Sequence, residues 1–93
     1  MLYVITYDIP DDARRLKLAK VLEGFGQRVQ RSVFECDLTE REYRVLTKKV
    51  MRVVNLNEGD SVRIYRLCSA CAANVEVKGA GPPVEKSVDI YII

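Results

Sequence analysis

The chain has 93 residues, of which 48% are hydrophobic and 30% charged, a composition typical of one small globular domain. Its 15 Lys and Arg against 13 Asp and Glu leave a net charge of +2, which is too small to predict a nucleic-acid partner by itself. The absence of histidine excludes Ser-His-Asp triads and Cys-His dyads built from one chain.

The sequence gives no sign of a membrane segment. No apolar run approaches the roughly 18 residues that a transmembrane helix needs. The opening stretch MLYVITYDI lacks the basic start and the small-residue cleavage site of a signal peptide. We therefore expect a cytoplasmic protein with no membrane partner.

Residues 2–9 predict a buried strand, because β-branched and aromatic side chains occupy both parities. This pattern is typical of a central strand that is covered on both faces. The strand ends in an acid, Asp8, shortly before Pro10. Asp8 has two interpretations, the cap of a turn or a metal ligand.

A helix is predicted next. Asp11 or Asp12 is placed to cap it, and acids there also complement the helix dipole. The stretch ARRLKLAKVLEGFG, with Gly24 or Gly26 as its stop, carries a helical stripe of apolar residues: Leu18, Val21, Leu22 and Phe25. Residues 28–38 then predict a second strand, eleven residues long.

The stretch TERE that follows predicts a capping box, in which Thr39 and Glu42 satisfy each other's backbone amides. The helix it starts should run to about residue 53. Residues 61–68 predict a third strand and NVEVKG, residues 74–79, a fourth. Periodicity leaves the pairing order open, and we favour an α+β, ferredoxin-like βαββαβ variant with an extra C-terminal strand.

The end of the chain predicts a dimer. We assign residues 1–80 to the domain, 81–87 to a Gly/Pro-rich linker and 88–93, VDIYII, to a last strand. An apolar strand of this kind is hazardous as a free edge, so we expect it to pair with a second copy in a two-fold homodimer. If the axis passes near Asp8, two carboxylates converge and form a plausible Mg²⁺ site, with Mn²⁺ also possible.

Three cysteines stand at positions 36, 68 and 71, and CSAC has metal-like spacing. A zinc site would need further ligands, which a chain without histidine can take only from a carboxylate or a partner chain. A disulfide within CSAC is a second possibility. Buried free thiols are the interpretation we favour.

Basic residues cluster near the acids and are candidates for holding phosphate oxygens: Arg14, Arg15, Lys17, Arg28 and Arg31. A charged helix face that only meets solvent is the alternative.

The stretch YDIPDDARRLKLAKVLEGFGQRVQRSVFE resembles the N-terminal signature of the small CRISPR-associated adaptation proteins, the Cas-two family, and DSVRIYRLC resembles a later strand of that family. The resemblance implies a ferredoxin-like homodimer with RVQRSVFECDL as second strand, DSVRIYRL as third and VEVKG as fourth. It implies that Asp8 binds metal and is catalytic in both subunits, with Tyr7, Arg15, Arg28 and Phe34 handling nucleic acid or supporting the site. Arg31 departs from the pattern, because an aromatic residue is frequent there.

The resemblance also implies a function in CRISPR adaptation. Such a protein joins the CRISPR integrase subunit, captures DNA fragments, and in some members cleaves single-stranded RNA or duplex DNA with Mg²⁺. A non-catalytic DNA-binding scaffold that bridges integrase dimers is the alternative. A toxin-like ribonuclease of similar fold is a second one.

Overall fold

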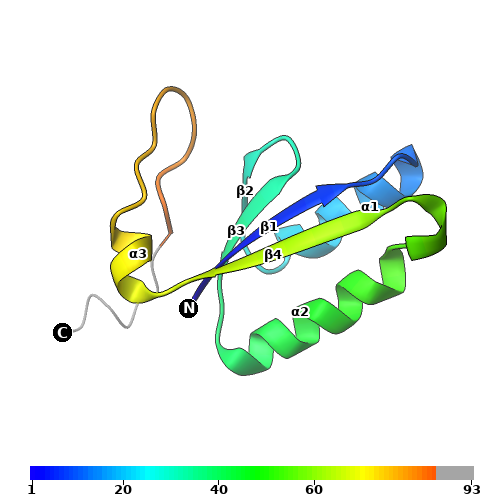
Figure 1. Cartoon of the computed structure of the whole chain (residues 1–93), viewed down its shortest axis with the longest axis horizontal. Coiled ribbons are helices and arrows are strands. Elements are labelled where there is room, and N and C mark those ends of the chain that lie inside the picture. Colours follow the sequence, from blue (N-terminus) through cyan, green and yellow to red (C-terminus); the bar gives the residue numbers. More distant parts are fainter. Residues whose placement is uncertain (86–93) are drawn as a thin grey trace.

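The computed structural model describes residues 1–85 as a four-stranded antiparallel sheet with helices against one face (Figure 1). The elements run in the order β1 (Leu2–Asp8), α1 (Asp12–Glu23), β2 (Gln27–Gln30), β3 (Val33–Asp37), α2 (Glu40–Val53), a short 3-10 helix (Leu56–Glu58), β4 (Ser61–Leu67) and α3 (Ser69–Ala73). The strands lie in the order β2-β3-β1-β4. This is the βαββαβ ferredoxin-like arrangement, so the predicted fold class is confirmed.

The hairpin that this fold requires lies inside the stretch predicted as one strand, 28–38, and that prediction is wrong. The chain turns at Arg31 and Ser32, so that Gln30 pairs with Val33 and Arg28 with Phe34. A register irregularity between Arg28 and Gln30 adds to the bend. The amide of Tyr7 donates to the carbonyl of Ser32 at 3.1 Å and ties the turn to β1.

The predicted fourth strand at 74–79 is also wrong. The stretch SACAA forms the helix α3, and residues 75–78 after it have no regular structure. The fourth strand of the fold is instead β4, which pairs with β1 along its whole length. The predicted strand at 88–93 lies outside the described residues.

The two helices predicted from capping signals form where expected. Asp11 caps α1 by accepting from the amide of Arg14 at 2.8 Å. Thr39 and Glu42 form the complete capping box at the start of α2, with bonds of 2.8 and 3.2 Å. Each bond satisfies an amide that the first helical turn leaves free.

The core lies between the helices and one face of the sheet. Alternate residues of β1, Tyr3, Ile5 and Tyr7, are buried there with Phe34 and Cys36 of β3. The helices contribute their apolar stripes to the same cluster: Leu18, Ala19 and Leu22 from α1, and Leu46 and Val50 from α2. Deleting such a fully buried side chain costs about 2–5 kcal/mol.

The other face of the sheet carries Val4, Thr6 and Asp8 from β1, because successive side chains of a strand point to opposite faces. Val4 and Thr6 are half-buried and Tyr65 of β4 is exposed. We call this surface the open face. The prediction that β1 is covered on both faces is therefore confirmed for the face that packs against the helices. The open face is only partly covered in the single chain. Within residues 1–85, no helix is long and apolar enough to cross a membrane.

Candidate functional site

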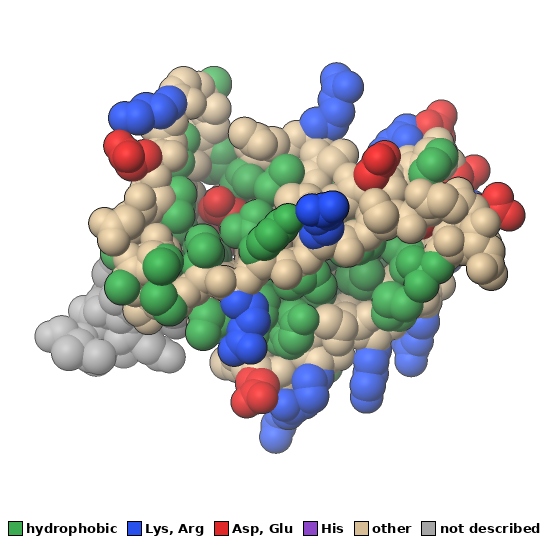
Figure 2. All heavy atoms as spheres, in the orientation of Figure 1, with side chains coloured by type: hydrophobic (Ala, Val, Ile, Leu, Met, Phe, Trp, Pro, Cys, Tyr) green, Lys and Arg blue, Asp and Glu red, His purple; other side chains and the backbone are tan. Residues whose placement is uncertain are grey.

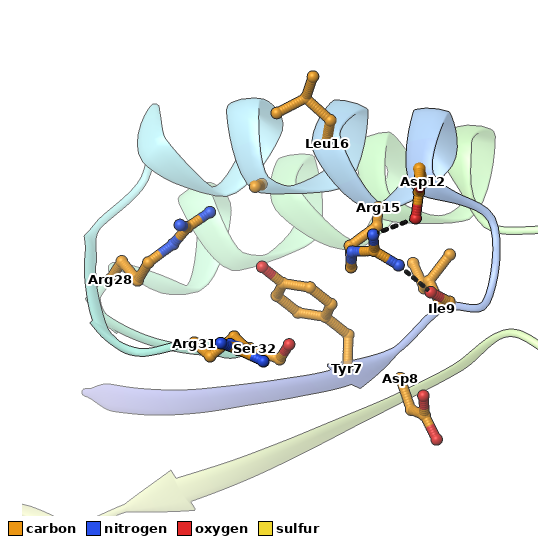
Figure 3. Close-up of a pocket in the computed structure, with 10 residues that line it drawn as sticks. Tyr7, Asp8, Ile9, Asp12, Arg15, Leu16, Arg28, Arg31 and Ser32 are labelled. Carbon is orange, nitrogen blue, oxygen red and sulfur yellow. Dashed lines mark hydrogen bonds and ion pairs between the residues drawn. The ribbon is translucent and has the colours of Figure 1, made fainter.

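A hollow of about 770 Å³ opens where β1 ends, between α1 and the β2–β3 turn (Figure 3). Three of the predicted basic residues and two acids line it. The full lining is Tyr7, Asp8, Ile9, Asp12, Arg15, Leu16, Ala19, Arg28, Arg31 and Ser32. Residues far apart in the sequence thus meet at one end of the sheet.

The arginines of the hollow are held in different ways. Arg15 donates to the carbonyl of Ile9 at 2.9 Å and forms an ion pair with Asp12, so its guanidinium is fixed at the end of β1. Arg28 lies over the ring of Phe34, 5.5 Å from its centre, and Arg31 is exposed in the hairpin turn. Guanidinium groups placed in this way suit the oxygens of a phosphate.

Tyr7 lines the hollow, and the buried ring of Phe34 lies beneath Arg28 without being part of the lining. Phe34 is fully buried, and the ring of Tyr7 lies 6.3 Å from it. Figure 3 shows Tyr7 pointing from β1 toward α1. Tyr7 and Phe34, predicted as supporting residues, therefore lie in the core, where they can support Arg28 and the turn by packing.

Asp8 is exposed and belongs to the open face, as the alternation of β1 requires. In Figure 3 its carboxylate points away from Tyr7 and from Arg28 and Arg31. Asp8 therefore lines the rim of the hollow without facing its arginines. Its backbone pairs with Ser61, the first residue of β4.

One chain offers few ligands for a metal. Among the described residues, no three Cys, Asp or Glu side chains gather as a candidate metal site. Asp12 is engaged by Arg15, which leaves Asp8 as the exposed acid at the strand end. A site with one or two carboxylates and several waters is what Mg²⁺ commonly takes, so the residues fit such an ion when a second Asp8 is added.

Arg14 lies outside the lining of the hollow and is engaged by an acid, so its predicted contact with nucleic acid stays a prediction. Its guanidinium donates to both carboxylate oxygens of Asp60, at 2.8 and 3.0 Å, and the amide of Asn55 donates to Asp60 at 2.8 Å. These hydrogen bonds, from Arg14 above all, lower the pKa of Asp60, and the bond to Asp60 raises the pKa of Arg14. The Asp60 side chain is fully enclosed, so this pair fastens α1 to the loop before β4.

Sequence reasoning missed Asp60, because a partner 46 residues away in the chain leaves no local signal. The remaining predicted base, Lys17, is exposed on α1 and is not part of the hollow. Its role as a nucleic-acid contact stays a prediction.

Other basic side chains form a band on α2. Arg41, Arg44, Lys48, Lys49 and Arg52 are all exposed there. Figure 2 shows basic side chains along the edge formed by this helix and hydrophobic ones over the sheet.

Comparison with known proteins identifies the family. The family model for CRISPR associated protein Cas2 matches residues 1–75. The chain belongs to the Cas2 family. It is 58% identical over 93 residues to a CRISPR-associated endoribonuclease Cas2 of Chloroflexus aurantiacus, with all of both chains covered. It is 49% identical over 81 residues to a CRISPR-associated endonuclease Cas2 of Thermus thermophilus, which covers 87% of this chain and 84% of that one.

Solved structures agree with this assignment. A hypothetical protein of Thermus thermophilus matches with a TM-score of 0.77 at 48% identity, covering 87% of this chain and 93% of that one. Cas2 of Streptococcus pyogenes matches at 0.74 and 32% identity, covering 85% and 100%. A chain in a partial Cas6-RT-Cas1–Cas2 complex matches at 0.72 and 29% identity, covering 92% and 98%. The resemblance first drawn from YDI and RVQRSVFE is therefore confirmed.

Proposed function

We propose that this Cas2 protein is a homodimeric nuclease of CRISPR adaptation, in which Asp8 of both copies binds Mg²⁺ and phosphodiester bonds are hydrolysed. The observation that carries the proposal is the position of Asp8: it is exposed, on the open face, and at the rim of a hollow lined by three arginines. Mn²⁺ would suit the same oxygen ligands.

The open face supports the dimer. An exposed sheet face is ordinary for an antiparallel sheet, but this one carries half-buried Val4 and Val33, and Tyr65 that is 49% exposed. Packing this face against a second copy would bury those side chains. Because Asp8 lies on the same face at the end of β1, a two-fold axis near that end would bring two copies of it together.

The basic residues support a nucleic-acid substrate. The relatives are named endoribonuclease and endonuclease, so RNA and DNA are both candidates. In the proposed site, phosphate groups of the nucleic acid are held and oriented by Arg15, Arg28 and Arg31. Asp8 holds the metal, which supplies polarisation of the phosphate oxygens and activation of water when it is bound.

Cleavage assays on Asp8 variants test the proposal. Purified protein should cleave single-stranded RNA or duplex DNA only with Mg²⁺ or Mn²⁺, and Asp8→Ala and Asp8→Asn should both abolish cleavage. Asp11→Asn is the matched control, because Asn caps a helix as well as Asp and residue 11 is also an exposed acid near the site. Cleavage that survives in both Asp8 variants would refute the assignment.

Binding assays test the arginines separately. Arg28→Ala and Arg31→Ala should each weaken binding to RNA or DNA and reduce the dependence of log K on log salt by about one. Arg41→Ala, on the exposed band of α2, is the control and should change neither cleavage nor binding at the hollow. Unchanged affinity in both hollow variants would count against a phosphate-binding role.

A second candidate, a scaffold that bridges integrase dimers on DNA, is favoured by the similarity to a chain in a Cas1–Cas2 complex. Spacer acquisition in cells distinguishes it from the nuclease. Under the scaffold hypothesis acquisition persists in Asp8→Ala and fails when Arg28 and Arg31 are both changed to Glu. Loss of acquisition in Asp8→Ala, with folding and DNA binding intact, would favour the nuclease.

A further inference from the structure

The three cysteines of the chain lie in two very different environments. Cys36 is fully buried in the core, and burial raises the pKa of its thiol to about 12. Cys68 and Cys71 are both exposed at the end of the sheet where β4 leads into α3. The prediction that the thiols are buried is therefore confirmed for Cys36 and wrong for Cys68 and Cys71. Only Cys68 and Cys71 can meet a reagent in solution.

The two exposed cysteines face each other across one turn of chain. Cys68 caps α3 in an extended conformation, with φ −66° and ψ 168°, and the amide of Cys71 donates to its sulfur at 3.4 Å. This bond holds the Cys68 Sγ over the turn on which Cys71 stands. Residues three apart on a helical turn are neighbours, so the two cysteines lie on the same side of this turn.

Further hydrogen bonds keep the turn in this shape. The amide of Ala72 donates to the carbonyl of Cys68 at 2.8 Å, and the side chain of Asn74 donates to the carbonyl of Ala70 at 2.9 Å. The backbone between the two sulfurs is thus already ordered in the reduced chain. A bond between them would join two residues of one ordered turn.

We propose that Cys68 and Cys71 form a redox-active dithiol that closes reversibly to an intramolecular disulfide. The site lies outside the hollow around Asp8, because neither cysteine contributes to its lining. It therefore adds a modification site to the protein whether or not the protein is a nuclease.

The acid–base properties of the pair match this chemistry. The hydrogen bond from the backbone amide of Cys71, and then that from its thiol, lower the pKa of Cys68. The same contact raises the pKa of Cys71, because its thiol proton is held by the sulfur of Cys68. Cys68 is thus the thiol that ionises first and attacks, and Cys71 is the one that resolves.

The reaction balances with a small-molecule disulfide, such as oxidised glutathione, as the oxidant. The Cys68 thiolate attacks one sulfur of that disulfide, and the first small thiol leaves with a proton from solvent. Cys71 then loses its proton to solvent and attacks the Sγ of Cys68, which releases the second small thiol. The two protein thiols are oxidised to one disulfide, and one small-molecule disulfide is reduced to two thiols.

A metal does not explain the pair as well. Two thiolates supply half of a tetrahedral zinc site, and the described residues offer no third Cys, Asp or Glu that gathers with them. Because both thiols are exposed, they are open to reduction as well as oxidation, which favours a reversible link.

Mass spectrometry of the full chain in glutathione buffers tests the proposal. After acid quenching and alkylation, trypsin releases residues 67–78 with both cysteines and residues 32–41 with Cys36 alone. Oxidation should lower the mass of peptide 67–78 by about 2 Da relative to the free dithiol, the loss of two hydrogens. Peptide 32–41 should carry the alkyl group and no glutathione, and dithiothreitol should reverse the change in peptide 67–78.

Single variants give the order of attack. Cys71→Ser should leave Cys68 trapped as its mixed disulfide with glutathione, because no resolving thiol remains. Cys68→Ser should react with oxidised glutathione more slowly than Cys71→Ser at neutral pH, because it lacks the sulfur that accepts the hydrogen bond of the Cys71 amide. Three results would overturn the proposal: glutathione on both cysteines without closure, disulfide-linked dimers on non-reducing gels, or tightly held zinc that prevents oxidation.

Discussion

Gly26 offers a sharp test of the packing that positions the site. It lies between α1 and β2, and a Cβ built on it would overlap the carbonyl oxygen of Glu35. The same atom would lie 2.6 Å from the Sγ of Cys36 and 2.8 Å from its Cα. Two of these three atoms are backbone of β3, which lies inside the sheet between β2 and β1. Gly26→Ala can be accommodated only if the strand or the chain after α1 moves.

Overpacking of a tight site costs about 1–3 kcal/mol, and the backbone neighbours place Gly26→Ala near the upper end. For a domain of this size, 1 kcal/mol shifts Tm by roughly 4–8 °C, so 3 kcal/mol corresponds to about 12–24 °C. The variant should also weaken nucleic-acid binding, because β2 and the hairpin turn carry Arg28 and Arg31.

Thermal and urea unfolding followed by circular dichroism measure the effect. Both should be run at two protein concentrations, since the proposed dimer would make Tm depend on concentration. Gly24→Ala is the control: its backbone is helical, with φ −74° and ψ −8°, and its Cβ would lie 3.3 Å from the carbonyl of Val21. It should stay within about 1 kcal/mol of the parent. A Gly26→Ala protein as stable as Gly24→Ala would refute the reasoning.

Three further substitutions test local energetics. The lowered pKa of Asp60 means that its ion pair stabilises the fold above the ordinary pKa of 3.8 and that this stabilisation is lost as the pH falls below it. Asp60→Asn should therefore make the free energy of unfolding depend less on pH in the acid range. Glu35→Gln should raise Tm at neutral pH but not below pH 4.5, because burial raises the pKa of Glu35 and penalises its charged form; no gain at neutral pH would contradict this. Thr39→Ala removes the capping box of α2 and should cost about 0.5–2 kcal/mol in urea unfolding, against a neutral Thr47→Ala control.

The parts of the fold that could be predicted from the sequence are those with local causes. The strand β1 and the two long helices follow from apolar periodicity, and the helix starts follow from Asp11 and Thr39, whose side chains bond amides three residues ahead. The family motif singled out Asp8, Arg15 and Arg28 as candidate site residues, and all three line the hollow.

The parts that could not be predicted depend on partners distant in sequence. The hairpin turn at Arg31 and Ser32 carries none of the Gly, Asn or Asp residues that mark tight turns. The alternation of Val75 and Val77 is strand-like, yet a strand forms only where a neighbouring strand accepts it. The bond of Arg14 to Asp60 likewise arises only when α1 and the loop before β4 come together.

The alternation of β1 divides the candidate site into two parts. Tyr7 points into the hollow and Asp8 to the open face, so the arginines and the acid stand on opposite sides of one strand end (Figure 3). A nucleic-acid strand bound by Arg28 and Arg31 must therefore pass around the end of β1 to reach Asp8 of the same protomer. This separation predicts that binding and cleavage respond to different substitutions. Asp8→Asn should abolish cleavage with little change in Kd, whereas Arg28→Ala should raise KM and Kd. A parallel loss of affinity in both would instead place the acid inside the binding surface.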